Sequence, residues 1–596
     1  MKIHLLALIF FVGLAELNSC NKSTLDQAAL GALNESDLTN KNGVEGLLIG
    51  AYSMLDGIDI NNTNLDFQQW GASGSNWIYG SVCGTEAHKG SDPGDQSDIM
   101  DLEKFIASST NKMLASKWGA LYEGVSRTNR VLIIMKKAKD IKPDDQRRIA
   151  AEARFLRGFY HFEAVKIWNH VPYVDDSISY EAGNYRLGNT VPIWADIESD
   201  FIFAKDNLPV IMNAVGRANK FVAEAYLAKL YMFEHDFPKA KALFDDIIQN
   251  GVTAIGHPYA LKQHYADNFN PDFKNDSESI FAAQSSVNDG ASGNNGDMGD
   301  ILNYPYGGPI GCCGFFQPSQ WLVNHFKTDP STGLPDLDFF DQSDVTSDQG
   351  VSPDSPYIPY QGALDPRLDW TVGRRGIPYL DWGVHQGASW IRNQASAGPY
   401  SPIKNVYYKY QQGHLNDHSF WTQGSTATNI NLFRFSDLLL LAAEAETELG
   451  NLNQAEKYVN MVRNRAADPS GWVHTYVDPS NPDGGYTTTS AAFYFINPYP
   501  PGNFGNNGQD FARKAIRYER LLELGMEGHR FFDLVRWGIA GTEITRYLGK
   551  EHNLISYLNG VMFQSPKNEY FPIPQAQIDL SVGPDGKRNM IQNPGY

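Results

Sequence analysis

Acidic, basic and imidazole side chains gather in one short stretch of the sequence, "RYERLLELGMEGHRFFDLVRWG", residues 517–538. Such a set could carry general acid–base catalysis, in which a side chain of shifted pKa transfers a proton. A carboxylate paired with a guanidinium group, however, has a lowered pKa and is a poor general acid. The spacing favours such pairing, because opposite charges recur three positions apart, as on a helix: Arg520 with Glu523, Arg530 with Asp533, and Asp533 with Arg536. We therefore predict that this stretch braces the fold; a catalytic or ligand-binding role is the alternative.

Motifs that mark common catalytic sites are absent from the chain. No histidine is followed by glutamate, so the HExxH zinc motif does not occur, and there is no GxSxG, GxGxxG or Walker A loop. Glycoside hydrolysis by two carboxylates stays open, since 68 acidic residues supply many candidate pairs. The Asp- and Asn-rich segment 288–300 lacks the spacing of an EF-hand and is interpreted as a solvated loop rather than a Ca²⁺ site. We expect no catalytic residue, metal or cofactor.

The composition excludes some classes of partner. The chain has 596 residues, of which 42% are hydrophobic, enough to bury a large core. Its formal net charge is −19, so the phosphates of nucleic acid would repel it. Docking on anionic lipid by charge alone is disfavoured for the same reason.

The first 20 residues, "MKIHLLALIFFVGLAELNSC", have the layout of an export signal. Lys2 precedes an apolar run over 5–15, which is too short to span a bilayer comfortably. Leu17, three places before Cys20, and the small Ser19 resemble the bacterial lipobox, which implies acylation of Cys20 after removal of residues 1–19. The alternative is an ordinary cleaved signal peptide. A chain with an acylated Cys20 would be held at the membrane by lipid alone.

The other cysteines are Cys83, Cys312 and Cys313. Adjacent cysteines rarely pair, because disulfide geometry strains so small a ring. We expect buried thiols, or at most one bridge through Cys83, and no metal site.

Helical periodicity predicts the scaffold that must position any site. Apolar residues recur at helical spacing in segments 36–56, 111–139 and 144–169. In 224–251 large and small apolar residues interlock over two helix faces as in a tetratricopeptide unit, and 438–466 repeats the pattern. Such units bury their faces only by stacking. These two should therefore meet in space.

Three segments carry little helical periodicity and many turn residues: 61–108, 256–430 and 468–509. Loops of this length inside a compact protein are usually functional. The sequence thus predicts a mostly α fold, in which a tetratricopeptide-repeat helical scaffold carries long irregular loops and a few short strands.

Four stretches together resemble the SusD/RagB family of Bacteroidota outer-membrane lipoproteins, across essentially the whole chain. They are "LDQAALGALNESDLTNKNGVEGLLIGAYSML", "AEARFLRGFYHFEAVKIWNHVPYV", the opening stretch 517–538, and "YFPIPQAQIDL" with the terminal "QNPGY". The resemblance implies a division into a lipoprotein signal (1–19), an N-terminal helical part with tetratricopeptide units (20–255), a loop-rich ligand-binding insert (256–430) and a C-terminal part with a further unit (431–596).

The resemblance also implies a function. The chain would be a cell-surface protein of the outer membrane that binds glycans without catalysis, as the partner of a SusC-like TonB-dependent transporter. Some relatives handle peptides, so a peptide or glycopeptide binder of the same build is the first alternative. An outer-membrane glycosidase, or a scaffold that binds proteins in its tetratricopeptide grooves, would be further alternatives.

Ligand contacts are expected from exposed aromatics in the irregular segments, because sugar rings stack on Trp and Tyr while their hydroxyls bind polar groups. The candidate rings are Trp70, Trp77, Tyr79, Tyr304, Tyr306, Trp321, Trp382, Trp390 and Trp421, and the candidate polar partners are Asn76, Asp95 and Arg392. For each ring the alternative is burial against the scaffold, which is the commoner fate of a tryptophan.

Overall fold

The computed structural model describes residues 35–58, 67–419 and 421–596, which form mostly helices and four small antiparallel sheets. The helical scaffold and its long loops confirm the predicted fold class. Within these ranges, no helix combines the length and the apolar character that crossing a membrane requires. The proposed signal and Cys20 lie outside the described residues.

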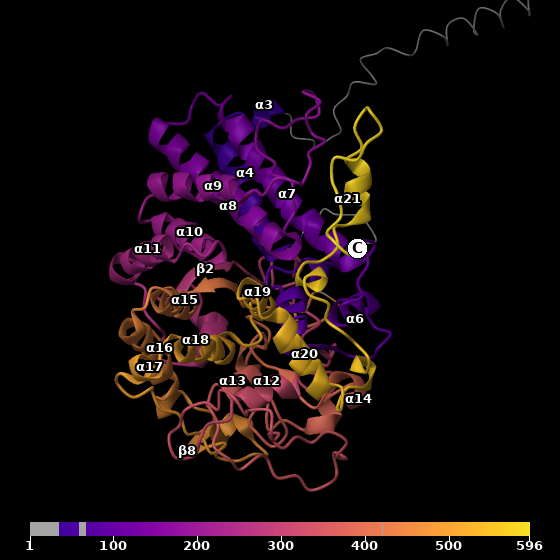
Figure 1. Cartoon of the computed structure of the whole chain (residues 1–596), viewed down its shortest axis with the longest axis vertical. Coiled ribbons are helices and arrows are strands. Elements are labelled where there is room, and N and C mark those ends of the chain that lie inside the picture. Colours follow the sequence, from indigo (N-terminus) through magenta and orange to yellow (C-terminus); the bar gives the residue numbers. More distant parts are fainter. Residues whose placement is uncertain (1–34, 59–66, 420) are drawn as a thin grey trace, which may run out of the picture.

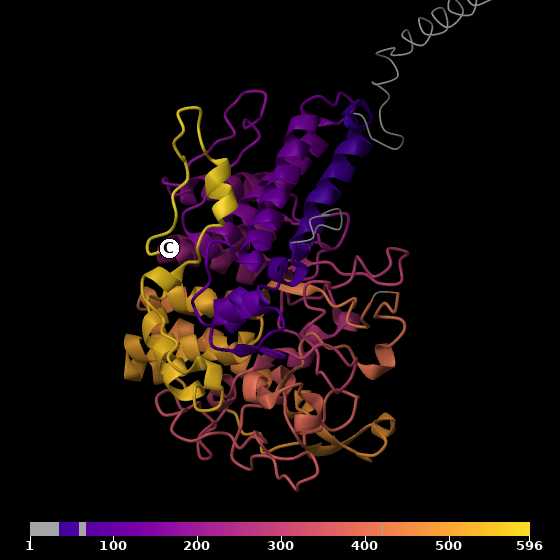
Figure 2. The same ribbon diagram turned by 90° about the vertical axis from the view of Figure 1, so that its right-hand side faces the viewer.

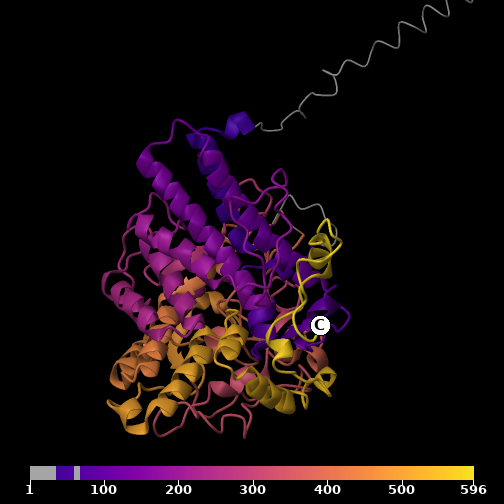
Figure 3. The same cartoon turned by 45° about the horizontal axis from the view of Figure 1, so that its top comes forward.

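The N-terminal third is a layer of helices packed in sequence order. α4 lies against α7 and α8, and α9, α10 and α11 continue the layer. Asn111 begins α7 by accepting hydrogen bonds from the backbone N–H groups of Met113 and Leu114. Pro143 opens α8 at its first position, where no N–H is needed. The bounds are α3 Glu35–Leu38, α4 Lys41–Tyr52, α7 Lys112–Met135, α8 Pro143–Trp168, α9 Trp194–Asn207, α10 Lys220–Phe233 and α11 Phe237–Asn250. Figure 3 shows the long helices α7 and α8 lengthwise.

The second predicted helix pair docks on the first. α15 packs against α11, although about 190 residues separate them, and α16 and α18 continue the stack (Figure 1). This confirms that the two tetratricopeptide-like units meet in space. The bounds are α15 Phe435–Glu448, α16 Leu452–Ala466, α17 Asn503–Asn507, α18 Gln509–Leu524, α19 Arg530–Arg536, α20 Ala540–Glu551 and α21 Gln575–Leu580.

Irregular chain with short strands occupies the other end of the molecule. Figures 1 and 2 show the N-terminal helices at one end of the long axis and the hairpin that contains β8 at the opposite end. All four sheets pair two strands: β1 (Ala87–Gly90) with β3 (Phe315–Pro318), β2 (Ser279–Ala283) with β6 (Ile430–Arg434), β4 (Val372–Gly373) with β5 (Ser401–Pro402), and β7 (His474–Tyr476) with β8 (Tyr486–Ser490). Three short helices lie among them: α12 Gln320–His325, α13 Leu368–Thr371 and α14 Gln394–Ala397.

Two sequence predictions need correction. The predicted helix 36–56 is interrupted, since a bend at Thr39–Asn40 separates α3 from α4 and a 3₁₀ turn follows α4. The predicted loop 61–108 contains α5, a π-helical turn, β1 and α6, because short apolar runs within it are buried although glycine and serine surround them. The bounds of these elements are α5 Gln69–Ala72, the π-helical turn Trp77–Val82 and α6 Ser97–Glu103.

The charged stretch at 517–538 is a buried ion network, as predicted. Glu523 bonds the guanidinium groups of Arg434 (2.5 Å), Arg465 (2.5 Å) and Arg367 (3.0 Å). Burial alone would raise the pKa of the Glu523 carboxyl, but these three cations hold it well below its usual range. The residue is therefore a fixed anion rather than a proton donor.

The partners within that stretch differ partly from the prediction. Asp533 and Arg536 pair at 2.9 Å as expected. Arg520, however, binds Asp533 (2.8 Å) and Asp437 (2.7 Å) instead of Glu523, and the carboxylate paired with Arg530 is that of Glu543, at 3.9 Å. Arg520 and Glu523 share α18, but Glu523 is bound by guanidinium groups from other elements, and the turn after α18 brings Asp533 of α19 opposite Arg520.

The cysteines also require a correction. Cys312 and Cys313 are bonded to each other, against the expectation that these neighbours do not pair. Cys83 is a buried free thiol, as expected, and burial raises its pKa well above the ordinary value.

A buried histidine ties the first irregular segment to the C-terminal helices. His88 Nδ1 lies 3.0 Å from Glu103 and Nε2 lies 3.0 Å from Glu551. Burial would lower the pKa of this imidazole, but the hydrogen bonds to the two carboxylates raise it to about 9. His88 is therefore a cation at neutral pH.

We predict that Glu523→Gln lowers the free energy of unfolding by about 3–5 kcal/mol, because it removes a buried anion that three guanidinium groups share and leaves an uncompensated positive charge in the network. The matched control is Asp483→Asn, which removes the carboxylate of an exposed pair with Lys409 and should cost less than about 1 kcal/mol. Equilibrium denaturation in urea measures both losses. Equal losses for the two variants would contradict a dominant role for the network.

A second prediction concerns pH. Because the folded-state pKa of His88 is raised, the stability it contributes is complete below pH 6.5 and is lost as pH rises through about 9. We expect the free energy of unfolding to fall between pH 6.5 and about 9. In the double variant Glu103→Gln/Glu551→Gln the fall should be smaller by about 2–3 kcal/mol, since the raised pKa is lost. Identical pH profiles would refute the assignment.

Candidate ligand-binding site

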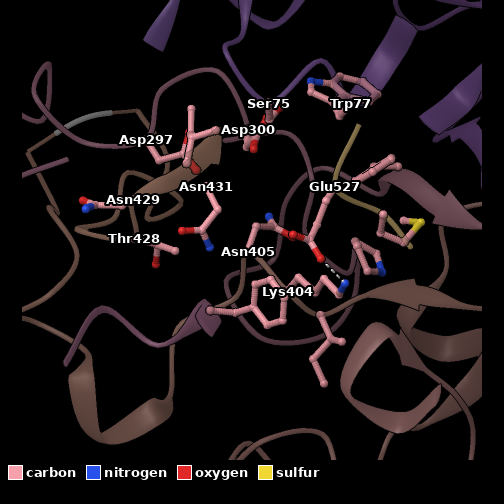
Figure 4. A pocket seen from close by; sticks show the side chains of 16 residues that line it. Ser75, Trp77, Asp297, Asp300, Lys404, Asn405, Thr428, Asn429, Asn431 and Glu527 are labelled. Atoms are coloured by element: carbon pink, nitrogen blue, oxygen red, sulfur yellow. Dashed lines mark hydrogen bonds and ion pairs between the residues drawn. The ribbon is translucent and has the colours of Figure 1, made fainter. Parts of the chain in front are cut away.

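Residues from several irregular segments line one cleft beside the ion network. Its walls come from the first irregular segment, the insert 256–430, the start of β6 and the turn after α18. The lining residues are Ser75, Trp77, Phe269, Asp297, Asp300, Phe316, Pro402, Ile403, Lys404, Asn405, Thr428, Asn429, Ile430, Asn431, Met526 and Glu527 (Figure 4). The loops therefore converge in space, although more than 450 residues separate the first from the last.

Close backbone contact holds the turn after α18 against the π-helical turn. Gly528 adopts φ +75°, and a Cβ there would lie 1.9 Å from the carbonyl oxygen of Ser75. A Cβ on Gly80 would lie 1.8 Å from the carbonyl oxygen of Gly528. Only glycine permits this approach, which sets Glu527 beside Ser75 and Trp77.

Aromatic rings form part of the cleft wall. The rings of Trp77 and Phe316 pack with centroids 5.4 Å apart. Phe269 lines the cleft as well, with Lys404 Nζ 4.6 Å from its ring centroid. These rings provide apolar surface of the kind that the C–H faces of a sugar contact.

Two buried carboxyl groups lie among the polar lining residues. Asp300 accepts hydrogen bonds from the hydroxyls of Ser75 (2.7 Å) and Ser73 (3.1 Å), and burial raises its pKa to about 6 despite these bonds. Asp297 is buried too, and burial together with the charge of Asp300 raises its pKa well above the ordinary range. Near neutral pH, Asp300 carries a negative charge, and this charge favours the protonated form of Asp297.

An ion pair connects the cleft to the ion network. Lys404 Nζ lies 2.7 Å from Glu527 Oε1, the pair that the dashed line marks in Figure 4. Arg434 binds the other oxygen of Glu527 at 2.8 Å and also pairs with Glu523. Burial lowers the pKa of Lys404 to about 8 although Glu527 favours the charged form, so the lysine stays cationic at neutral pH.

Several buried polar atoms of the lining have no hydrogen-bond partner among the described residues. They are Trp77 Nε1, Asp297 Oδ1 and Thr428 Oγ1. Buried polar groups are nearly always paired in folded proteins. These three atoms are shielded from solvent, so a ligand reaches them only when neighbouring side chains shift. The cleft has room for roughly five water molecules.

Three residues predicted from sequence lie in or directly behind the cleft. Trp77 lines it, and Asn76 next to Trp77 donates from Nδ2 to Glu163 at 2.9 Å. Tyr304 lies behind the wall, since its hydroxyl donates to the carbonyl oxygen of Asn405 at 3.2 Å. Trp77, Asn76 and Tyr304 are buried, however, so the predicted exposure is wrong for them.

A second group of predicted residues forms a separate surface cluster. Arg392 lies over the ring of Tyr306, 5.0 Å from its centroid, and donates from Nη1 to Asp95 at 2.8 Å. The Tyr306 side chain is 42% exposed. This cluster joins the first irregular segment to the insert.

The remaining aromatic candidates divide by burial. Tyr79, Trp321 and Trp390 are buried, which corrects the prediction of exposure. Tyr79 and Trp321 belong to the main core, whereas Trp390 packs within a separate apolar cluster of the insert, on Tyr379 at 5.4 Å. Trp70 and Trp382 are half-buried, and their indole N–H groups donate to Gln96 and to the carbonyl oxygen of Tyr407. Trp421 is 58% exposed.

Sequence reasoning missed most polar residues of the cleft. Asp297, Lys404, Asn405 and Thr428 belong to no motif, and only folding brings them together. The acid-rich segment 288–300 was a partial signal, because it contains Asp297 and Asp300. Across the described ranges, no group of three or more His, Cys, Asp or Glu residues is arranged to hold a metal ion.

Comparison with known proteins shows what the chain is similar to. The model of the SusD family matches residues 277–596, and the model described as "Starch-binding associating with outer membrane" matches residues 57–232. The chain is 24% identical over 522 residues to the SusD-like protein P2 of Formosa agariphila, and the match covers 85% of each chain.

Solved structures resemble it over nearly their whole length. A SusD superfamily protein of Bacteroides vulgatus has a TM-score of 0.63 at 20% identity, covering 94% of this chain and 99% of that one. Surface glycan-binding protein A of Bacteroides thetaiotaomicron, solved in complex with laminarihexaose, has a TM-score of 0.59 at 19% identity, covering 93% and 99%. At these identities the likeness shows the fold.

Proposed function

The chain belongs to the SusD family, whose model matches more than half of it, and from this premise we propose that it is a cell-surface lipoprotein that binds glycans without catalysis. It captures an oligosaccharide outside the cell and delivers it to a SusC-like TonB-dependent transporter of the outer membrane. The helical scaffold supports the irregular loops, and the loops make the ligand contacts.

The cleft beside Trp77 is the observation that carries this proposal. Aromatic surface and buried polar atoms without partners lie there side by side. Sugars need both, because their rings present C–H patches and their hydroxyls donate and accept hydrogen bonds. The surface cluster of Tyr306, Arg392 and Asp95 provides a second contact of the same kind. A glycan longer than one ring would contact such surface rings outside the cleft.

The ion pairs prevent Glu527 from acting as a proton donor in the cleft. A glycosidase needs one carboxyl group that donates a proton and another that stays ionised. Glu527, the acid of the opening stretch that reaches the cleft, is held ionised: burial raises its pKa, but Arg434 and Lys404 lower it below the usual range. Hydrolysis of a glycan by the pure protein would argue for the glycosidase instead.

Ring stacking at the surface cluster can be tested by Tyr306→Ala. We expect affinity for the bound glycan to fall by about 1–3 kcal/mol, by analogy with base–aromatic stacking. The control is Tyr180→Ala, which removes another exposed ring, in a segment outside the candidate site. Affinity electrophoresis against a polysaccharide panel, followed by calorimetry, gives both values. Unchanged affinity would remove Tyr306 from the site, and binding of peptides but of no glycan would favour the peptide-binding alternative.

Lipid anchoring can be tested by Cys20→Ala. Removal of the acylated cysteine should release the protein from the membrane fraction. The apolar run over 5–15 is too short to span the bilayer comfortably, so without the lipid the chain has no stable anchor. Fractionation followed by immunoblotting measures the distribution, with Cys83→Ala as the control. Continued retention of the Cys20 variant would show that lipid on this residue is not the anchor.

A further inference from the structure

We infer that the cleft lined by Asp297, Thr428 and Glu527 accepts one uncharged, hydroxyl-bearing sugar ring and rejects rings that carry a carboxylate or a sulfate. The inference rests on the proposed function and names the class of glycan that this function serves. Three properties of the cleft support it: charge, hydrogen-bonding pattern and size.

The charge of the lining opposes an anionic ligand. Its acidic residues are Asp297, Asp300 and Glu527, and Lys404 is the one basic side chain among the described lining residues. Lys404 is already bonded to Glu527 at 2.7 Å. Arg434, behind Glu527, is occupied by Glu527 and Glu523. A carboxylate or sulfate entering here would lose its hydration, gain no unpaired cation and face Asp300.

The unpaired polar atoms fit hydroxyl groups. Trp77 Nε1 is a donor and needs an acceptor, whereas Thr428 Oγ1 can donate or accept and Asp297 Oδ1 accepts, or donates when protonated. These side chains are at least nine-tenths buried. A sugar hydroxyl both donates and accepts, so hydroxyl groups match the hydrogen-bonding capacity of each of these atoms. An ammonium group only donates and would leave the indole N–H unpaired.

The size of the cleft restricts the ligand to one ring. Room for roughly five water molecules accommodates a single pyranose at a chain end, not an internal stretch of polysaccharide. The rings of Trp77, Phe316 and Phe269 provide the apolar part of the wall. The rest of an oligosaccharide would then extend along the outer surface of the loops.

The test compares matched ligands on the full-length protein. A panel of neutral oligosaccharides that includes laminarihexaose and maltohexaose first identifies one that the protein binds. The probes are then this oligosaccharide, its 6-carboxylate form and its 6-sulfate. We expect the charged forms to bind at least tenfold more weakly by calorimetry. Equal or tighter binding of the charged forms would overturn the charge inference while leaving glycan binding intact. Binding of no glycan at all would overturn this inference together with the proposed function.

Two variants locate the effect in the cleft. Asp300→Asn removes the charge that faces the ligand, so the ratio of the affinity for the neutral glycan to that for the carboxylated glycan should fall at least threefold. The control is Asp354→Asn, which changes an exposed acid outside the cleft and should leave this ratio unchanged. Thr428→Val keeps the shape but removes the hydroxyl, and should weaken neutral binding about fivefold; Thr489→Val, on exposed β8, is its control. Thermal melting confirms that each variant is folded. If Asp300→Asn leaves the ratio of neutral to carboxylated affinity unchanged and Thr428→Val leaves the affinity for the neutral glycan unchanged, the sugar ring binds elsewhere and the inference fails.

Discussion

The structure depends on the bonding of one buried carboxylate, Glu523, to three guanidinium groups. These come from a turn of the insert (Arg367), the end of β6 (Arg434) and α16 (Arg465), so a single side chain joins the insert, a sheet and two helices. Burying so many charges is costly, and the cost is offset only when every charge has a partner. Moving any of these charged groups would leave a buried charge without its partner. The network therefore fixes the relative positions of the insert, the sheet and the two helices, which packing alone would hold less firmly.

The same network explains why irregular loops can form a defined cleft. Loops lack the regular hydrogen bonding of helices, so their geometry must be set by other contacts. Arg434 extends the network to Glu527, and Glu527 binds Lys404 in the insert. Gly528 and Gly80 bring the same turn against the first irregular segment. The walls of the cleft are thus positioned by charge pairing on one side and by close backbone contact on the other.

The sequence predicted the features that depend on local pattern. Helical periodicity located α7, α8 and both repeat pairs, because a helix that buries one face must repeat its apolar residues. It could not supply the partners of Glu523, which lie 58, 89 and 156 residues away. Arg520 was assigned to Glu523 by helical spacing, but the turn after α18 sets it opposite Asp533. Trp77 was identified as a contact, yet its burial depends on Phe316, more than 200 residues distant.

Locking carboxylates into ion pairs has a consequence for function as well as for stability. General acid catalysis needs a carboxyl group whose proton moves near neutral pH, and the cations around Glu523 and Glu527 hold both groups ionised. Asp297 and Asp300, whose pKa values burial raises, lie instead in a cleft with room for one ring, where their carboxyl groups can form hydrogen bonds with a ligand. Such a pair can hold a hydroxyl-rich ligand in one orientation. The ion pairs that make the scaffold rigid therefore also divide the acidic residues into two groups. Glu523 and Glu527 stabilise the structure, whereas Asp297 and Asp300 can bind a ligand.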